Sequence, residues 1–133
     1  MKVYLCGPID NCTYEEMHGW REDLKFTDSN HKWVDPTRRD FRGKEILYNK
    51  ELVELDKWDI RNSDVVLVRW NKPENTCVGS SMEILYAHSL DIPVILWCNE
   101  GEKLSPWLVY HSLHVVNSEE EALSKLRELE FVF

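Results

Sequence analysis

The sequence predicts an α/β protein built on a five-stranded parallel sheet. Short apolar runs alternate along the chain with longer segments in which apolar residues recur at helical spacing. Strands that alternate with helices form parallel sheets with right-handed crossovers. For five such units we expect the strand order 2-1-3-4-5, which gives a flavodoxin-like three-layer sandwich with helices on both faces of the sheet.

Five segments have the composition of strands. Each is rich in β-branched and other apolar residues, and turn-forming residues adjoin it. The predicted strands are residues 2–6, 32–35, 64–70, 92–98 and 113–116.

Helices are predicted between these strands and after the last one. Thr13-x-x-Glu16 has the pattern of a capping box, so a helix should begin there and run to about Phe26. The acidic segment after Ser118 begins a final amphipathic helix that runs through Leu129. The other predicted helices cover about 45–61, a segment that begins near Ser80, and about 105–111.

Composition restricts the function classes. The 133 residues predict one domain over residues 1–133, and 43% hydrophobic with 30% charged residues is typical of a globular chain. A net charge of −8 argues against a general nucleic-acid-binding surface. The apolar N-terminal run is too short for a signal peptide and no run approaches a membrane span, so we expect a cytoplasmic protein without a membrane partner.

The cysteines and histidines do not form a metal-binding pattern. The four cysteines show no Cys-x-x-Cys spacing, and Cys6 and Cys98 fall in predicted strands, as small buried side chains do. His111-x-x-His114 is an isolated pair. We therefore expect neither a metal ion nor another cofactor.

The predicted topology places a ligand site where the first and third strands end. The strand order reverses there, so the loop 7–10 and the loop 71–79 should face one another. Glu83 should lie in the first turn of the following helix, where the helix dipole favours an ionised, nucleophilic carboxylate. Ser80-x-x-Glu83 also fits a capping box, in which the glutamate only closes the helix end, and both interpretations stay open.

Two further residues are candidates for this site. Asp56 falls within an apolar stripe of its predicted helix, where burial would raise the pKa of a carboxyl group toward the range useful for acid catalysis. A position at the edge of the stripe would leave it a surface residue. Tyr4 lies near the end of the first strand, where its hydroxyl either reaches the site or belongs to an ordinary core aromatic.

Three arginines follow the second strand. Arg38, Arg39 and Arg42 lie in a polar loop on the ligand side of the sheet. One of them could bind a phosphate or a base, although a solvated loop is the usual interpretation of such a cluster.

These positions together resemble the nucleoside 2-deoxyribosyltransferase superfamily, which includes the 2′-deoxynucleoside 5′-monophosphate N-glycosidases. The resemblance runs along nearly the whole chain. The residues that carry it are Tyr4-Leu-Cys-Gly-Pro-Ile9, Asp56-x-x-x-Ile60-x-x-Ser63-Asp64-Val-Val-Leu-Val68 and Gly79-x-x-Met82-Glu83-x-x-Tyr86-Ala87, before Ile92-Pro93-Val94.

The resemblance implies roles for the three candidate catalytic residues. Glu83 would be the nucleophile, Asp56 the general acid and base for the nucleobase, and Tyr4 the residue that orients the nucleophile and the sugar. The implied reaction is a retaining double displacement at C1′ of a 2′-deoxynucleoside through a covalent glycosyl-enzyme. Such chemistry calls for a low pKa at Glu83, which the helix start favours, and a raised pKa at Asp56.

The resemblance also implies a substrate-binding set and a homo-oligomer whose sites are completed across the subunit interface. The partners would be a deoxynucleoside or deoxynucleotide and a nucleobase. The substrate-binding set is Gly7, Pro8, Ile9, Cys77, Gly79 and Ser105.

The chain departs from both branches of the superfamily. Cys77 stands where transferases commonly carry an aspartate, and Asp10 stands where the monophosphate hydrolases tend to carry an arginine. Ser105 looks more like the serine that those hydrolases borrow from a neighbouring subunit to bind phosphate. Deoxyribosyl transfer is favoured slightly, because a carboxylate in the first loop would repel a phosphate, and hydrolysis of a monophosphate is the alternative.

Two other hypotheses remain. A TIR-like NAD hydrolase also has a five-unit parallel sheet and a catalytic glutamate, but the sequence shows no recognisable TIR pattern. A non-catalytic nucleotide-binding domain would use Glu83 only as a helix cap.

Overall fold

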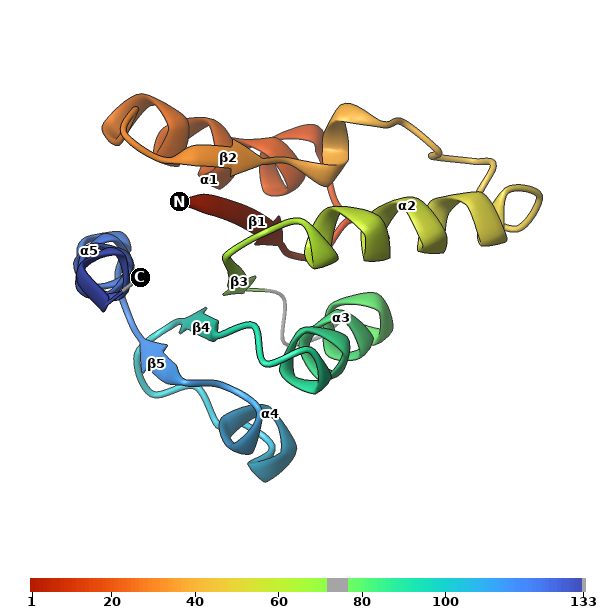
Figure 1. The fold of residues 1–133 in the computed structure, drawn as a ribbon. Coiled ribbons are helices and arrows are strands. Elements are labelled where there is room, and N and C mark those ends of the chain that lie inside the picture. Colours follow the sequence, from red (N-terminus) through yellow and green to blue (C-terminus); the bar gives the residue numbers. More distant parts are fainter. Residues whose placement is uncertain (72–76, 133) are drawn as a thin grey trace.

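The computed structural model describes residues 1–71 and 77–132, and its centre is a parallel sheet of five strands (Figure 1). The strand order is β2-β1-β3-β4-β5, as predicted, and every neighbouring pair is parallel. The strands are β1 (Lys2–Cys6), β2 (Lys32–Val34), β3 (Val65–Trp70), β4 (Val94–Cys98) and β5 (His114–Val116). Their centres match the predicted segments, and their ends differ by at most two residues.

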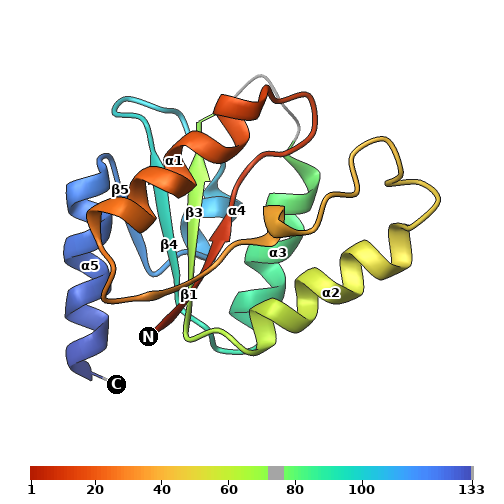
Figure 2. The same cartoon turned by 90° about the horizontal axis from the view of Figure 1, so that it is seen from above.

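Helices cover both faces of the sheet and complete the predicted three-layer arrangement (Figures 1 and 2). On one side lie α1 and α5, and on the other lie α2, α3 and α4. The helices are α1 (Tyr14–Thr27), the 3-10 turn η1 (Pro36–Arg38), α2 (Asn49–Arg61), α3 (Val78–Ser89), α4 (Pro106–Tyr110) and α5 (Glu119–Val132).

Alternation along the strands separates two apolar cores. In β1, Val3 and Leu5 face α1 and α5, whereas Tyr4 and Cys6 face α2 and α3. Parallel strands that are buried on both faces consist of nearly continuous apolar residues, which is why the strand segments could be recognised. The β1 side chains that point toward α2 and α3 lie next to Glu83, a residue of the site described below.

Two of the predicted helix caps are confirmed. Thr13 and Glu16 form both hydrogen bonds of a capping box at the start of α1. The Oγ of Ser118 accepts a hydrogen bond from the backbone N–H of Glu121 at the start of α5, at 3.1 Å. That helix continues to Val132, beyond the predicted Leu129.

The predicted start of α2 at residue 45 is wrong, because residues 45–48 form turns and the helix begins at Asn49. Ile46 and Leu47 are 91% and 77% exposed, so the apolar residues that suggested a helix there have no surface to pack against. Gly43, at φ +78°, adopts a backbone conformation that favours glycine and sits just before this turn.

The capping-box interpretation of Glu83 is also wrong. The residue that precedes α3 is Cys77, in the left-handed conformation at φ +49°, and no side chain caps the helix there. Ser80 therefore lies inside α3, and Glu83 lies in its second turn rather than its first. A cap no longer explains why a glutamate stands at this position.

None of the helices within residues 1–71 and 77–132 is both long and apolar enough to cross a membrane.

Candidate active site

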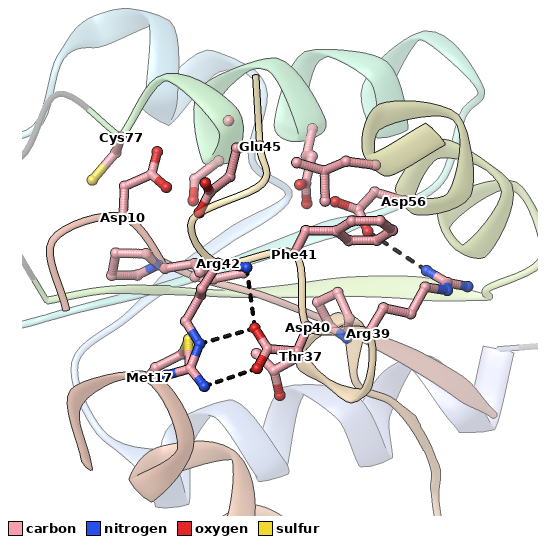
Figure 3. A pocket seen from close by; sticks show the side chains of 18 of the residues that line it. Asp10, Met17, Thr37, Arg39, Asp40, Phe41, Arg42, Glu45, Asp56 and Cys77 are labelled. Carbon is pink, nitrogen blue, oxygen red and sulfur yellow. Dashed lines mark hydrogen bonds and ion pairs between the residues drawn. The ribbon is translucent and has the colours of Figure 1, made fainter. Parts of the chain in front are cut away.

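A cavity of about 440 Å³ lies at the carboxyl ends of β1 and β3 (Figure 3). Its walls come from the loop after β1, the first turns of α3, the segment that follows β2, and one side of α2. The two loops predicted to face one another both line it, although residues 72–76 of the second loop lie outside the described residues. The site is thus where the reversal of strand order predicts it.

The cavity brings together most of the predicted site residues. Glu83 reaches it from α3 and Asp56 from α2, so two carboxylates far apart in the sequence face one space. Five of the six predicted substrate-binding residues also line it, namely Gly7, Pro8, Ile9, Cys77 and Gly79.

Ser105 does not line the cavity. It is the N-cap of α4, where its Oγ accepts a hydrogen bond from the backbone N–H of Trp107 at 3.2 Å. A role for Ser105 in a site formed by this same chain therefore has no support. Its exposed position is compatible with a contribution to a neighbouring subunit.

Glu83 sits in an environment that favours its neutral form. Burial, and then the charge of Asp56, raise the pKa of Glu83 to about 7. The sequence predicts the opposite direction from the helix dipole, which typically contributes less than about 1 kcal/mol. Desolvation of a buried carboxylate is a larger effect and dominates here.

Tyr4 and Cys6 lie beneath Glu83 on β1. Interaction with the Tyr4 hydroxyl and the Cys6 thiol lowers the pKa of Glu83 and opposes the effect of burial. The Tyr4 hydroxyl is buried and has no hydrogen bond of ordinary geometry within the described part of the chain. The Cys6 thiol also approaches the backbone oxygen of Ser80, at 4.0 Å. A hydroxyl donor and a weaker thiol donor therefore lie next to the carboxylate.

Asp56 has the partly buried position predicted from the apolar stripe. Its side chain is 15% exposed, and burial raises its pKa to about 6. The guanidinium of Arg39, 3.7 Å away, counteracts this rise, whereas the neighbouring carboxylate of Asp59 adds to it. Asp56 can thus hold a proton close to neutral pH, as a general acid must.

A buried arginine under the first loop was not predicted. Arg21 is fully buried on α1 and donates hydrogen bonds to the backbone oxygens of Met17, Leu5 and Gly7. Its guanidinium also lies 4.4 Å from the centre of the Trp20 ring. Arg21 therefore braces the end of β1 and the loop that lines the cavity. Arg21 is separated from the apolar Met17 and Leu24 by helical spacings of four and three residues, and the same pattern of a charged residue within an apolar stripe indicated Asp56.

All three arginines of the loop after β2 are paired with carboxylates. Arg38 and Arg39 contact Asp59 at 2.8 and 2.9 Å. The guanidinium of Arg42 makes two hydrogen bonds to Asp40, each of 2.9 Å (Figure 3). A phosphate bound by one of these arginines would have to compete with a carboxylate already in place.

The charged residues that line the cavity are predominantly acidic. Among the described lining residues, five carboxylates face two arginines. Asp10 and Glu45 approach the cavity from the loop after β1 and from the turn before α2 (Figure 3). The acidic residues are Asp10, Asp40, Glu45, Asp56 and Glu83.

No metal centre is evident in the described ranges, where no group of three His, Cys, Asp or Glu side chains is arranged to hold an ion.

No protein-family model and no curated protein matches the chain. Solved structures do match. A 2-deoxyribosyltransferase from Bacillus psychrosaccharolyticus has a TM-score of 0.76 at 16% identity, over 92% of this chain and 90% of that one. The chain has the fold of a 2-deoxyribosyltransferase.

Two further structures share this 2-deoxyribosyltransferase fold. A conserved protein from Enterococcus faecalis V583 has a TM-score of 0.71 at 17% identity, over 96% of this chain and 97% of that one. The CMP N-glycosidase BcmB of Clostridium botulinum has a TM-score of 0.61 at 20% identity, over 96% of this chain and 99% of that one. At 16–20% identity, these neighbours show a shared fold.

Proposed function

We propose that this protein cleaves the N-glycosidic bond of 2′-deoxynucleosides and transfers the deoxyribose to a second nucleobase. The observation that supports this proposal is the convergence of Glu83 and Asp56, from two helices, on one cavity, with Tyr4 next to Glu83. Both carboxyl groups have a raised pKa because they are buried. Paired carboxylates at a pocket are the usual machinery of glycosidic bond chemistry.

In the proposed first step, the ionised Glu83 attacks C1′ of the sugar. The C1′–N bond breaks through an oxocarbenium-like transition state, and its electron pair stays on the base nitrogen, which takes the proton of Asp56. The sugar is then held as an ester of Glu83. Tyr4, beneath the carboxylate, orients the nucleophile.

In the proposed second step, a nitrogen of another base attacks C1′ and the bond to Glu83 breaks. The Asp56 carboxylate accepts the proton that this nitrogen loses, which restores both residues. Water in place of the second base would give hydrolysis, and either acceptor gives retention at C1′.

The structural neighbours support glycosyl chemistry and leave its acceptor open. One of them is a 2-deoxyribosyltransferase and another is a CMP N-glycosidase. Hydrolysis of a 2′-deoxynucleoside 5′-monophosphate is therefore the alternative. The acidic lining and the paired state of Arg38, Arg39 and Arg42 favour a substrate without a phosphate.

We also propose that the protein forms a homo-oligomer with sites completed across the interface. Large apolar side chains are exposed on α2, α3 and α4, the helices of one face. Burying such side chains between copies of the chain would be favourable. The side chains in question are Leu55, Trp58, Met82, Leu85, Trp107 and Tyr110.

The proposed function is tested by incubation of the protein with each deoxynucleoside and each deoxynucleoside monophosphate, with and without a second free base. We expect exchanged nucleoside from deoxynucleosides when a second base is present, with slower release of free base to water. Release of base from monophosphates alone would select the hydrolase alternative. NAD is tested as a further compound in the same assay. Cleavage of NAD in place of deoxynucleosides would reject the proposal in favour of an NAD hydrolase.

Activity is expected to follow a narrow bell-shaped pH profile. The reaction needs one proton on the carboxyl pair, with Glu83 ionised and Asp56 protonated, which is the less populated of the two singly protonated arrangements because Glu83 has the higher pKa. The pKa values of about 6 and about 7 imply that the pair holds two protons below this range and none above it. The rate kcat/KM should peak between about pH 6 and pH 7 and fall on both sides, and a rate that stays flat from pH 5 to pH 9 would contradict the paired mechanism.

A further inference from the structure

Asp59 is a buried carboxylate that faces two arginines next to the cavity. It lies on α2, three residues after Asp56, and its side chain is 2% exposed. Its Oδ1 accepts hydrogen bonds from Arg38 at 2.8 Å and from Arg39 at 3.0 Å. A buried carboxylate with two charge-assisted hydrogen bonds is held in one geometry.

Arg39 joins Asp59 to Asp56. It projects from the segment after η1, and its Nη1 lies 2.9 Å from Oδ2 of Asp59. The same nitrogen lies 3.7 Å from Oδ1 of Asp56 (Figure 3). This nitrogen is buried, so the positive charge lies between the two carboxylates rather than in solvent. Arg38, in contrast, is 45% exposed and forms its ion pair with Asp59.

We propose that Arg39 is a positioning residue for Asp56: Asp59 holds its guanidinium, and the guanidinium orients Asp56 and stabilises the carboxylate that forms when the departing base takes the proton. The catalytic part of this proposal rests on the proposed function, whereas the action of Arg39 on Asp56 does not. Stabilisation of a charge that develops during the reaction, by a group already in place, lowers the barrier.

The charged groups around Asp56 make Arg39 the principal counter-ion. Glu83, on α3, interacts unfavourably with Asp56, since the charge of Asp56 raises the pKa of Glu83. Asp59 acts in the same direction on Asp56, and Tyr4 is a neutral neighbour on β1. Arg39 has the strongest opposing effect, followed by Arg38 and by Arg21 from α1. Loss of Arg39 should therefore leave Asp56 a weaker acid.

The test is a titration of the Asp56 carboxyl carbon by NMR in Arg39→Met, with Arg38→Met as the matched control. Both variants remove one arginine from Asp59, but only Arg39→Met removes the charge beside Asp56. We expect the pKa of Asp56 to rise from about 6 by about one pH unit in Arg39→Met, and by clearly less in Arg38→Met. Arg39→Lys should restore most of the original value. Equal rises in the two methionine variants, or no rise in either, would overturn the proposal.

Activity on deoxynucleosides gives a second, separate readout. With a deoxynucleoside substrate, Arg39→Met should lower kcat more than it raises KM and should shift the optimum of the pH profile to higher pH. A protein that cleaves no nucleoside but shows the expected titration would reject the proposed function and keep the Arg39–Asp56 interaction. An active protein whose Asp56 titration is insensitive to Arg39 would keep the proposed function and reject the Arg39–Asp56 interaction. Thermal unfolding of each variant identifies any that fails to fold, in which case Arg39→Gln against Arg38→Gln, which also removes one charge from each position, replaces the methionine pair.

Discussion

Glu83→Gln is expected to abolish activity and at the same time to make the protein more stable above neutral pH. An amide cannot act as the nucleophile, so the rate should fall by a factor on the order of 10³ or more. Glutamine keeps the shape of the side chain and never carries a charge. The variant should therefore fold and retain the cavity.

The gain in stability follows from the raised pKa of Glu83. A carboxyl group whose pKa rises from 4.5 to about 7 on folding stabilises the folded state fully below about pH 4.5, and this contribution is lost as the pH rises through 7. At pH 8 the charged, buried Glu83 of the native protein is thus unfavourable by up to about 3 kcal/mol. The glutamine variant avoids that cost, so its melting temperature should exceed that of the native protein at pH 8 and equal it near pH 4.5.

The measurements are a base-release assay and thermal unfolding at these two pH values. Glu45→Gln is the matched control, because it also removes one charge from the cavity lining but lies in the turn before α2. It should keep most of the activity and show no comparable stabilisation. If Glu83→Gln were active, another nucleophile would be required. A fall in stability at pH 8 instead of a rise would indicate that the ionised Glu83 stabilises the folded state.

The sequence was sufficient to predict the layers, the strand order and the meeting of Glu83 and Asp56. Apolar runs identify the strands because parallel strands are buried on both faces. The order of the strands then determines which loops meet, so residues far apart in the chain could be assigned to one cavity. The apolar stripe predicted the partly buried position of Asp56 for a related reason, since helical spacing alone indicates which side chains of a helix face the sheet.

The electrostatic state of the site could not be predicted in the same way. The expected low pKa of Glu83 assumed that the helix begins near Ser80, whereas α3 begins two residues earlier. It also took no account of the burial of the side chain, which is the largest cause of its raised pKa. The pairing of Arg39 with Asp59 and Asp56 depends on how the segment after β2 crosses α2. Such a crossing has no signature in local spacing. Sequence patterns therefore identified the two carboxylates that meet in the cavity but not the charges around them.

Asp56→Asn is expected to reduce activity strongly, but by an amount that depends on the leaving group. Loss of a general acid typically lowers a rate by about 10²–10⁴-fold when the leaving group needs a proton. A purine or pyrimidine base departs poorly without one. The p-nitrophenolate anion departs readily from a p-nitrophenyl deoxyriboside without a proton, so cleavage of this substrate should fall far less in the same variant.

The same substitution should also change the ionisation of Glu83. The negative charge of Asp56 is the second-largest cause of the raised pKa of Glu83, so its removal lowers that pKa. The acidic limb of the p-nitrophenyl reaction, which reports the ionisation of the nucleophile, should therefore move to lower pH in Asp56→Asn. Glu54→Gln removes an exposed charge from the same helix and should move neither the limb nor the rate. An equal loss for both leaving groups, with an unmoved acidic limb, would mean that Asp56 binds the substrate without donating a proton, and the assignment of the acid would then pass from α2 to another element of the cavity.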